Sequence, residues 1–175
     1  LKADIEPLYN QLYPNNVGAF EALLNTVQQY DFERSKVLKK WDLQGVEWLN
    51  SPNTVGMMLY VDLFSETLEN LKKRASYFQK LGITLLHLMP VLHPREGEND
   101  GGYAVKDYRE IDPKIGNMAE FQDLINHFHK KNIRICIDYV VNHTSDDHEW
   151  ALKAKSGDTA YQMYYFMYED DFIPK

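Results

Sequence analysis

The chain has very little cysteine, with Cys136 as the only one among its 175 residues. One thiol cannot form a disulfide framework within the chain or a cysteine zinc site. Cys136 lies inside the apolar run RICIDYV, so we expect it to pack in the core like a small hydrophobic residue.

Basic runs and long apolar runs are also lacking. The chain has 26 acidic residues and 19 lysine and arginine residues, a net charge of -7, which makes nucleic acid an unexpected partner. No stretch approaches the roughly 20 apolar residues of a membrane helix, and the first residues, LKADIEPLYN, do not have the pattern of a signal peptide. These features predict a protein that does not bind membranes. They allow a cytoplasmic location, and a secreted protein stays open because a segment could precede Leu1. No pattern in the sequence calls for a cofactor.

Apolar residues do make up 44% of the chain, enough for a sizeable core. Residues 1–50 have helical spacing, with one apolar stripe at Ile5, Leu8 and Leu12 and a second at Phe20, Leu23, Leu24 and Val27. The pattern changes at Ser51-Pro52. We therefore expect an N-terminal helical region over residues 1–50 and a domain boundary after it.

A strand and helix repeat follows this boundary. Three apolar runs predict strands at 55–64, 83–92 and 133–140, each covered on both faces. Helices are expected between them, one ending near Gly82 and one beginning at Asn117 with Glu120 completing a capping box. This order is typical of right-handed crossovers in a parallel α/β sheet.

Polar residues follow the predicted strands at the end where parallel sheets bind ligands. They are Asp62, the long loop after Pro90, and Asn142 with His143. Tyr103 and other apolar residues in that loop predict that it is ordered. Three strands cannot close a barrel of about 250 residues, so a (β/α)8 TIM barrel would be incomplete over residues 51–143.

Two segments carry a resemblance to a known family. DYVVNH at residues 138–143, continued by TSDDHEW, resembles the region at the end of the third barrel strand in glycoside hydrolase family 13, the α-amylase family. DGGYAVKDYREIDPKIGNM at residues 100–118 resembles the loop after the second strand. The form DGGYAV, preceded by LLHLMPVLHPREGEN, is most similar to the amylosucrase branch, which acts on sucrose. The resemblance implies that residues 144–175 begin an insertion, domain B.

The resemblance implies three sugar-binding residues. Tyr103 would be the aromatic platform under the glucosyl ring, His143 would bond the 6-hydroxyl of that sugar, and Asp100 would be the carboxylate at the pocket floor. Without the resemblance, the favoured interpretations are a packed loop tyrosine for Tyr103 and a structural histidine for His143, and Asp100 would be a turn residue before two glycines.

Two further residues would support the site. Asp138 would be a buried carboxylate that orients an arginine near the nucleophile, and that partner is expected to be missing from these residues. Asn142 occupies the position that binds calcium in many α-amylases, but TSDDHE is more similar to branches without the ion, so no metal is expected. A metal site at His143, Asp146, Asp147 and His148 is a weaker alternative, because no ligand motif is present.

The chemistry implied by the family is retaining glycoside transfer, which uses a carboxylate nucleophile and a carboxylic acid about 5 Å apart. The resemblance places these after the fourth and fifth strands, and no GFRxD-like segment follows Asn142. We therefore expect an N-terminal portion of an enzyme that acts on sucrose or an α-glucan, inactive alone. The alternative is a complete, non-catalytic module that binds a sugar or a protein. A fragment that folds alone is expected to self-associate through its open sheet edge, whereas a natural module would normally protect that edge.

Overall fold

The computed structural model describes residues 2–14 and 16–168. The chain forms two compact units, divided between Ser51 and Pro52, and each is described by itself. None of the helices in the described ranges is long and apolar enough to cross a membrane.

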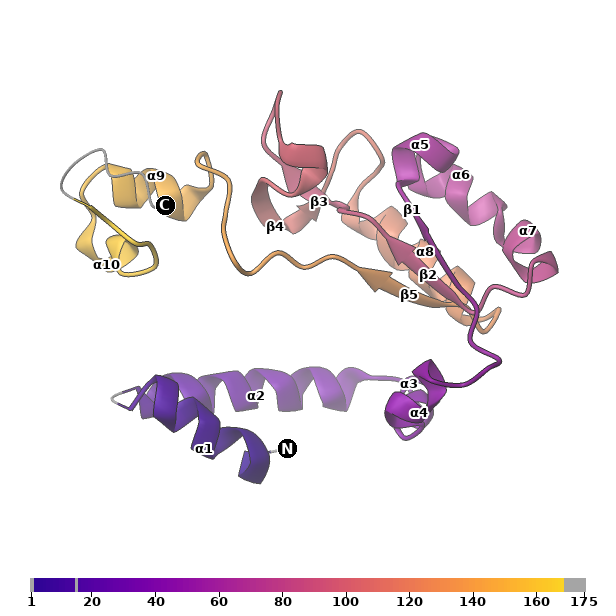
Figure 1. The fold of residues 1–175 in the computed structure, drawn as a ribbon, viewed down its shortest axis with the longest axis horizontal. Coiled ribbons are helices and arrows are strands. Elements are labelled where there is room, and N and C mark those ends of the chain that lie inside the picture. The colour runs from indigo at the N-terminus through magenta and orange to yellow at the C-terminus, as the bar shows by residue number, and fades with distance from the viewer. Residues whose placement is uncertain (1, 15, 169–175) are drawn as a thin grey trace. The chain divides into compact units, whose positions relative to one another are not determined.

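The first unit is helical throughout its described residues. It contains α1 (Lys2–Leu12), α2 (Val17–Glu33), α3 (Lys36–Asp42) and α4 (Gly45–Leu49) (Figure 1). Phe20 and Leu24 on α2 are buried, and the ring of Tyr9 packs on Phe20 with their centroids 4.8 Å apart. The region is helical, as expected, but the two predicted stripes are mostly exposed. Only Phe20 and Leu24 are buried; the exposed members are Ile5, Leu8, Leu12, Leu23 and Val27.

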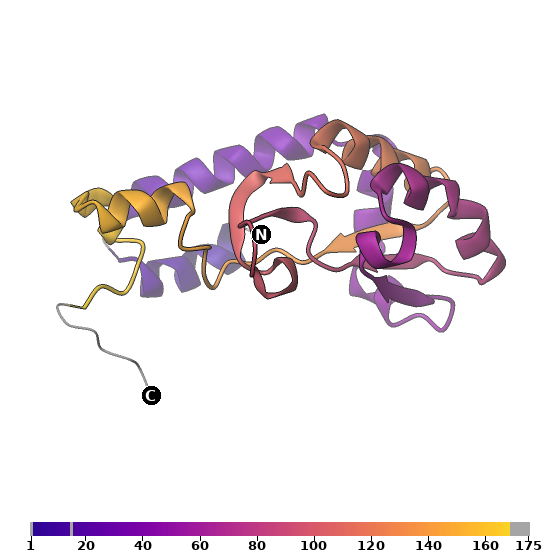
Figure 2. The ribbon, with the colours of Figure 1, turned by 90° about the horizontal axis from the view of Figure 1, so that it is seen from above.

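The second unit is built on a parallel sheet of three strands in the order β1 (Gly56–Leu59), β2 (Leu85–Leu88) and β5 (Arg134–Ile137). One face of the sheet packs against α6 (Leu68–Lys73), α7 (Ala75–Lys80) and α8 (Met118–His129), seen alongside the strands in Figures 1 and 2. Residues that alternate along the strands supply this core, including Leu59, Leu86 and Leu88. Period-two alternation thus directs one set of side chains toward the helices.

The opposite face of the sheet is open among the described residues. Met58 on β1 is 63% exposed, and Cys136 on β5 is exposed as well. The expectation that the strands are covered on both faces is therefore wrong for this chain, and so is the expectation that Cys136 packs in the core. Both errors have one cause: an apolar run shows that a strand is hydrophobic but not which neighbours cover it.

The first predicted strand, 55–64, is shorter than expected. β1 ends at Leu59, and α5 (Val61–Ser65) follows directly. Val61 and Ser65, four residues apart, are both buried, and the Ser65 hydroxyl donates to the Val61 carbonyl. A helical period therefore replaces the strand period here, and Asp62 lies exposed on a helix instead of at a strand end.

The helices between the strands are close to the predictions. Thr67 caps α6 by accepting from Asn70 N, and Arg74 separates α6 from α7. The predicted stripe of Leu68, Leu71, Ala75 and Phe78 is buried across both helices. Asn117 and Glu120 form the predicted capping box at the start of α8. Caps of this kind satisfy the free N–H groups of a first helical turn.

The long loop after β2 is ordered, as predicted. It contains β3 (Leu92–Pro94), the short 3-10 helix η1 (Asp100–Gly102) and β4 (Val105–Ile111), and β3 pairs with β4 in an antiparallel ladder. Val105 and Ile111 are buried in the core. After β5 the chain runs without regular structure to α9 (Glu149–Lys155) and α10 (Thr159–Gln162) (Figure 1). Residues 169–175 of the expected domain B segment lie outside the described residues.

Candidate active site

The strand register brings three polar side chains to one face of the sheet. His87 on β2 is opposite Met58 on β1 and Cys136 on β5. Tyr60 and Asp138 each follow one of those partners by two residues, at the carboxyl end of its strand. Because side chains two apart along a strand share a face, Tyr60, His87 and Asp138 belong to the open face of the sheet.

Asp138 is the centre of a hydrogen-bonded cluster that also contains His87 and Tyr103. One of its carboxylate oxygens, Oδ1, lies 2.8 Å from His87 Nε2, and the other, Oδ2, accepts a 2.8 Å hydrogen bond from the Tyr103 hydroxyl. Its side chain is 25% exposed and that of His87 is 33% exposed. Asp138 is therefore partly exposed and has two partners, whereas we expected a buried carboxylate without one.

The tyrosine hydroxyl is held in its protonated form. The hydrogen bond to Asp138, followed by burial and the nearby negative charge, raises the pKa of Tyr103 to about 12. A carboxylate only accepts hydrogen bonds, so the Tyr103 hydroxyl and His87 Nε2 are both donors. Tyr103 therefore has its hydroxyl anchored and its ring at the carboxyl ends of the strands.

A glycine turn positions Tyr103. Asp100, Gly101 and Gly102 all have positive φ angles, and the Asn99 side chain closes the turn by accepting from Gly102 N. A Cβ on Gly102 would lie 2.9 Å from Pro90 Cβ, and one on Gly101 would lie 3.3 Å from the Tyr60 hydroxyl. Two residues without side chains thus let the turn lie against Pro90 and Tyr60.

Asp100 lies close to this cluster but makes no direct bond to it that the structure describes. The residue is exposed, and its charge contributes to the raised pKa of Tyr103. Asp100 begins this turn, as expected if DGG serves only as a turn sequence. Its role as the pocket-floor carboxylate stays a prediction.

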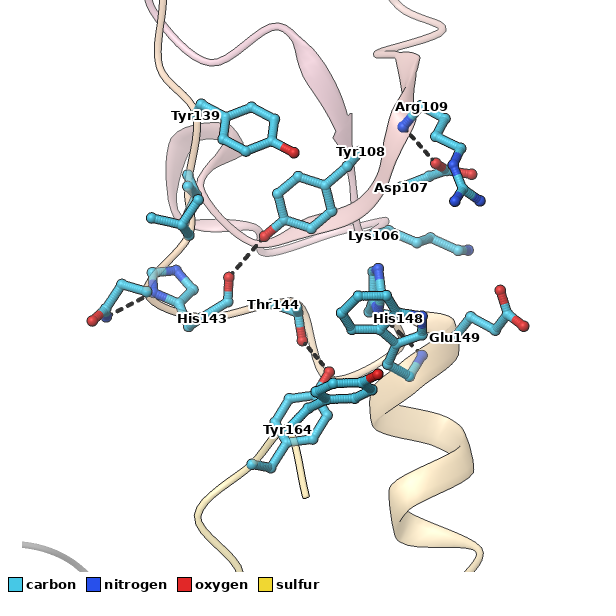
Figure 3. A pocket seen from close by; sticks show the side chains of 15 residues that line it. Lys106, Asp107, Tyr108, Arg109, Tyr139, His143, Thr144, His148, Glu149 and Tyr164 are labelled. Carbon is cyan, nitrogen blue, oxygen red and sulfur yellow. Dashed lines mark hydrogen bonds between the residues drawn. The ribbon is translucent and has the colours of Figure 1, made fainter. Parts of the chain in front are cut away.

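Asn142 and His143 are in a second location, a cavity of about 510 Å³ that neither Tyr103 nor Asp138 lines. Both residues are exposed, and Asn142 Nδ2 lies 3.3 Å from His143 Nδ1. The Tyr108 hydroxyl donates to the His143 carbonyl, as Figure 3 shows. Of the five predicted site residues, the structure therefore joins Tyr103 to Asp138 and Asn142 to His143, and it leaves the two pairs unconnected.

The walls of this cavity are rich in aromatic side chains. Tyr108 lies edge-on to both Tyr139 and His148 (Figure 3), and Trp150 stacks on Tyr164 with ring centroids 4.7 Å apart. Burial raises the pKa of Tyr108, so its hydroxyl remains a donor to the His143 carbonyl at neutral pH. The backbone at His143 is thus tied to β4 while the imidazole itself faces solvent.

The alternative metal site does not form. Asp146 pairs with Arg95 at 3.0 Å and with Lys155 at 3.4 Å, and Asp147 lies 3.5 Å from Lys106. Within the described ranges, no three histidine, cysteine or acidic side chains gather as metal ligands would. The acids after His143 are instead occupied by surface ion pairs.

The sequence does not single out His87, a member of the cluster, or Tyr60, which shares its face of the sheet. His87 lies within a predicted apolar strand, although it is the one ionisable residue in ITLLHLMPVL. A polar residue inside an apolar strand needs a hydrogen-bond partner, and this is true of both His87 and Asp138. The presence of one such residue in each of two neighbouring strands was a signal that His87 pairs with Asp138.

Comparison with known proteins identifies the family. Residues 49–173 match the catalytic domain of α-amylases. This chain belongs to the α-amylase family. The catalytic domain of that family is a TIM barrel, so the three-stranded sheet of this family member is part of such a barrel.

Individual relatives agree with this assignment. The chain is 38% identical over 93 residues to an oligo-1,6-glucosidase of Parageobacillus thermoglucosidasius, covering 53% of this chain and 16% of the relative. It is 42% identical over 99 residues to α-amylase 3 of Dictyoglomus thermophilum, covering 56% and 19%. The structure of an isomaltulose synthase variant of Erwinia rhapontici in complex with sucrose matches with a TM-score of 0.59 and 34% identity, covering 65% of this chain and 22% of that one. The match thus spans about a sixth to a fifth of each relative's length.

Proposed function

We propose that this chain supplies one wall of the sugar pocket of a retaining enzyme that acts on α-glucosides. The observation that carries the proposal is the hydrogen-bonded cluster of His87, Asp138 and Tyr103 in a chain of the α-amylase family. It lies where the strands of a (β/α)8 barrel present their catalytic groups. We take β1, β2 and β5 to be the first three strands of that barrel.

In this proposal the Tyr103 ring is the platform on which a glucosyl unit stacks. The hydroxyl is fixed on Asp138, which leaves a ring face for the apolar C–H surface of the sugar. His143 would bond the 6-hydroxyl of the same sugar, and Asp100 would lie at the pocket floor. Because His143 is exposed and apart from Tyr103 here, this role requires the segment after β5 to move toward the cluster.

Catalysis requires two carboxyl groups that the proposal does not assign to these residues. In retaining enzymes one carboxylate attacks the anomeric carbon, and a second carboxyl group protonates the leaving oxygen and later activates the acceptor. Asp138 is engaged by two donors, so it serves in positioning, not as the nucleophile. The nucleophile and the acid would be contributed by a longer polypeptide, of which these residues are a part.

Sucrose is the substrate that we favour within the α-glucosides. DGGYAV resembles the amylosucrase branch, and one structural relative was solved in complex with sucrose. An α-glucan is the second candidate, because the chain is also similar to an oligo-1,6-glucosidase and to an α-amylase.

The test is sucrose turnover, followed as release of fructose and glucose. We would measure the purified 175-residue chain beside the product of its full reading frame. Activity in the longer protein alone is the expected result. Activity in the short chain would mean that Asp62, Asp100 or Asp138 has a catalytic role that the proposal denies. A stop codon directly after Lys175, with sugar binding and no turnover, would favour the non-catalytic module.

A further inference from the structure

His87 has a contact that neither the family resemblance nor the proposed function uses. Its Nε2 lies 2.8 Å from Asp138 Oδ1, while the Tyr103 hydroxyl donates to the other oxygen of the same carboxylate. We propose that His87 is a positioning residue for the Tyr103 ring and that it acts through Asp138. The inference rests on the proposed function, in which that ring carries the sugar.

The three residues differ in how firmly the fold holds their backbones. His87 lies on β2, the middle strand, which pairs with β1 on one side and β5 on the other. Its neighbours Leu86 and Leu88 are fully buried against the helices. His87 is therefore the most constrained member of the cluster, because both its ladder and its flanking side chains are fixed.

The backbones of Asp138 and Tyr103 are less constrained by the sheet. Asp138 comes directly after the last residue of β5, where the ladder with β2 has ended, and Tyr103 follows a glycine turn. A carboxylate at a strand end can rotate unless both oxygens are engaged. His87 engages one oxygen and so fixes the direction in which the other accepts from Tyr103. The central strand thus fixes the orientation of Asp138, and Asp138 fixes the position of the Tyr103 hydroxyl in the loop.

The chemistry of the contact determines which nitrogen of His87 carries the proton. An ionised carboxylate has no hydrogen to give, so the bond requires a proton on Nε2. A neutral His87 must therefore be the Nε2–H tautomer. Glutamine at this position can also donate an N–H, whereas leucine has similar bulk and no donor.

The first test observes the bond in the 175-residue chain without any sugar. Nitrogen-15 NMR of histidine-labelled protein reports the tautomer of each of the six histidines, and His87→Gln assigns the His87 signals. We expect a proton on Nε2 that exchanges slowly with water in the unmodified chain and faster in Asp138→Ala, because the hydrogen bond protects it. An Nδ1–H tautomer, or an Nε2 proton whose exchange Asp138→Ala leaves unchanged, would overturn the proposal.

The second test measures whether the bond between His87 and Asp138 affects sugar binding by the Tyr103 ring. It uses the product of the full reading frame. His87→Leu should raise the KM for sucrose about tenfold with a smaller change in kcat, and His87→Gln should recover most of the loss. His127→Leu is the matched control, because His127 lies on α8 among the helices that cover the other face. It should leave both constants unchanged.

A double-mutant cycle separates positioning from a general structural role. Tyr103→Phe keeps the ring and removes the bond to Asp138, so adding His87→Leu should then cause little further loss. Equal losses in both backgrounds would overturn the proposal. A full-length protein without turnover of any α-glucoside would instead defeat the proposed function. The NMR experiment would still decide whether His87 holds Asp138.

Discussion

The two faces of the parallel sheet have opposite character. The face toward α6, α7 and α8 is apolar and closed, with Leu86 and Leu88 fully buried. The other face carries Met58 and Cys136, both exposed, and the cluster around Asp138. The same strands therefore provide an apolar core on one side and hydrogen-bonded polar side chains on the other. The open side is the one that a complete barrel would enclose.

The largest expected effect is on the free energy of unfolding, and it compares one substitution on each face of the sheet. Leu86→Ala removes a fully buried side chain and should lower the free energy of unfolding by about 2–5 kcal/mol. Met58→Ala, on the open face, should change it by less than about 0.5 kcal/mol. Urea denaturation of both variants is the measurement. Equal losses would show that the open face is covered in solution.

The next largest loss of stability is expected from a substitution in the glycine turn at residues 100–102. In Gly102→Ala the new Cβ meets Pro90 and the residue keeps a φ of +96°, which should together cost about 1–3 kcal/mol of stability. Gly157→Ala is a matched control, since Gly157 has a φ of +94° with nothing within 4 Å of the added atom. The difference between the two variants measures the contact with Pro90. If they lose the same stability, the turn does not depend on that contact.

The Tyr103 hydroxyl predicts a dependence of stability on alkaline pH. Its folded pKa of about 12 is above the ordinary tyrosine value of about 10, so the stabilisation is fully present below pH 10. It is lost as the pH rises through about 12. Tyr103→Phe should therefore be less stable than the unmodified chain at pH 9, and this deficit should shrink as the pH rises.

A titration checks the cause of the raised pKa. Asp138→Asn removes the charge that accepts from Tyr103, so the pKa of Tyr103 should fall toward its ordinary value. The difference in ultraviolet absorbance between each protein and its Tyr103→Phe variant isolates this one hydroxyl. A pKa that stays near 12 in Asp138→Asn would assign the shift to burial instead.

The smallest expected effect is weak self-association of the 175-residue chain. β1 and β5 are the edges of the sheet in the part of the chain that the structure describes, and edge strands have free backbone groups that pair with other chains. Sedimentation velocity at rising concentration should show an increasing sedimentation coefficient, reduced in Met58→Lys. A compact monomer at all concentrations would count against this.

Much of the second unit could be predicted from sequence, because local signals and tertiary packing agree there. The stripe through Leu68 and Phe78 and the cap at Asn117 are local patterns, and the structure has both. Strand ends were less predictable. Asp62 belongs to an apolar run in the sequence, but burial of Val61 and Ser65 makes that stretch a helix.

The candidate site was predictable only in part, because its residues come from distant parts of the chain. Tyr103 and Asp138 are 35 residues apart, and the resemblance identified both without joining them. His87 and Asp138 are both ionisable residues in predicted apolar strands, which suggests that they pair, but only the register of β2 against β5 shows that they share a face. The exposure of His143 follows from the course of the chain after β5, for which the sequence has no local signal.

In the proposed function, Tyr103 carries the sugar in an enzyme of the α-amylase family. The most direct test is sucrose turnover by the product of the full reading frame with Tyr103→Ala. Tyr77→Ala, which alters a half-exposed tyrosine on α7, is the control. Stacking of a nucleic-acid base on an aromatic side chain is worth about 1–3 kcal/mol. With a similar contribution for the sugar, kcat/KM should fall by about fivefold to 150-fold in Tyr103→Ala only. Unchanged turnover in Tyr103→Ala, or an equal loss in both variants, would contradict the account.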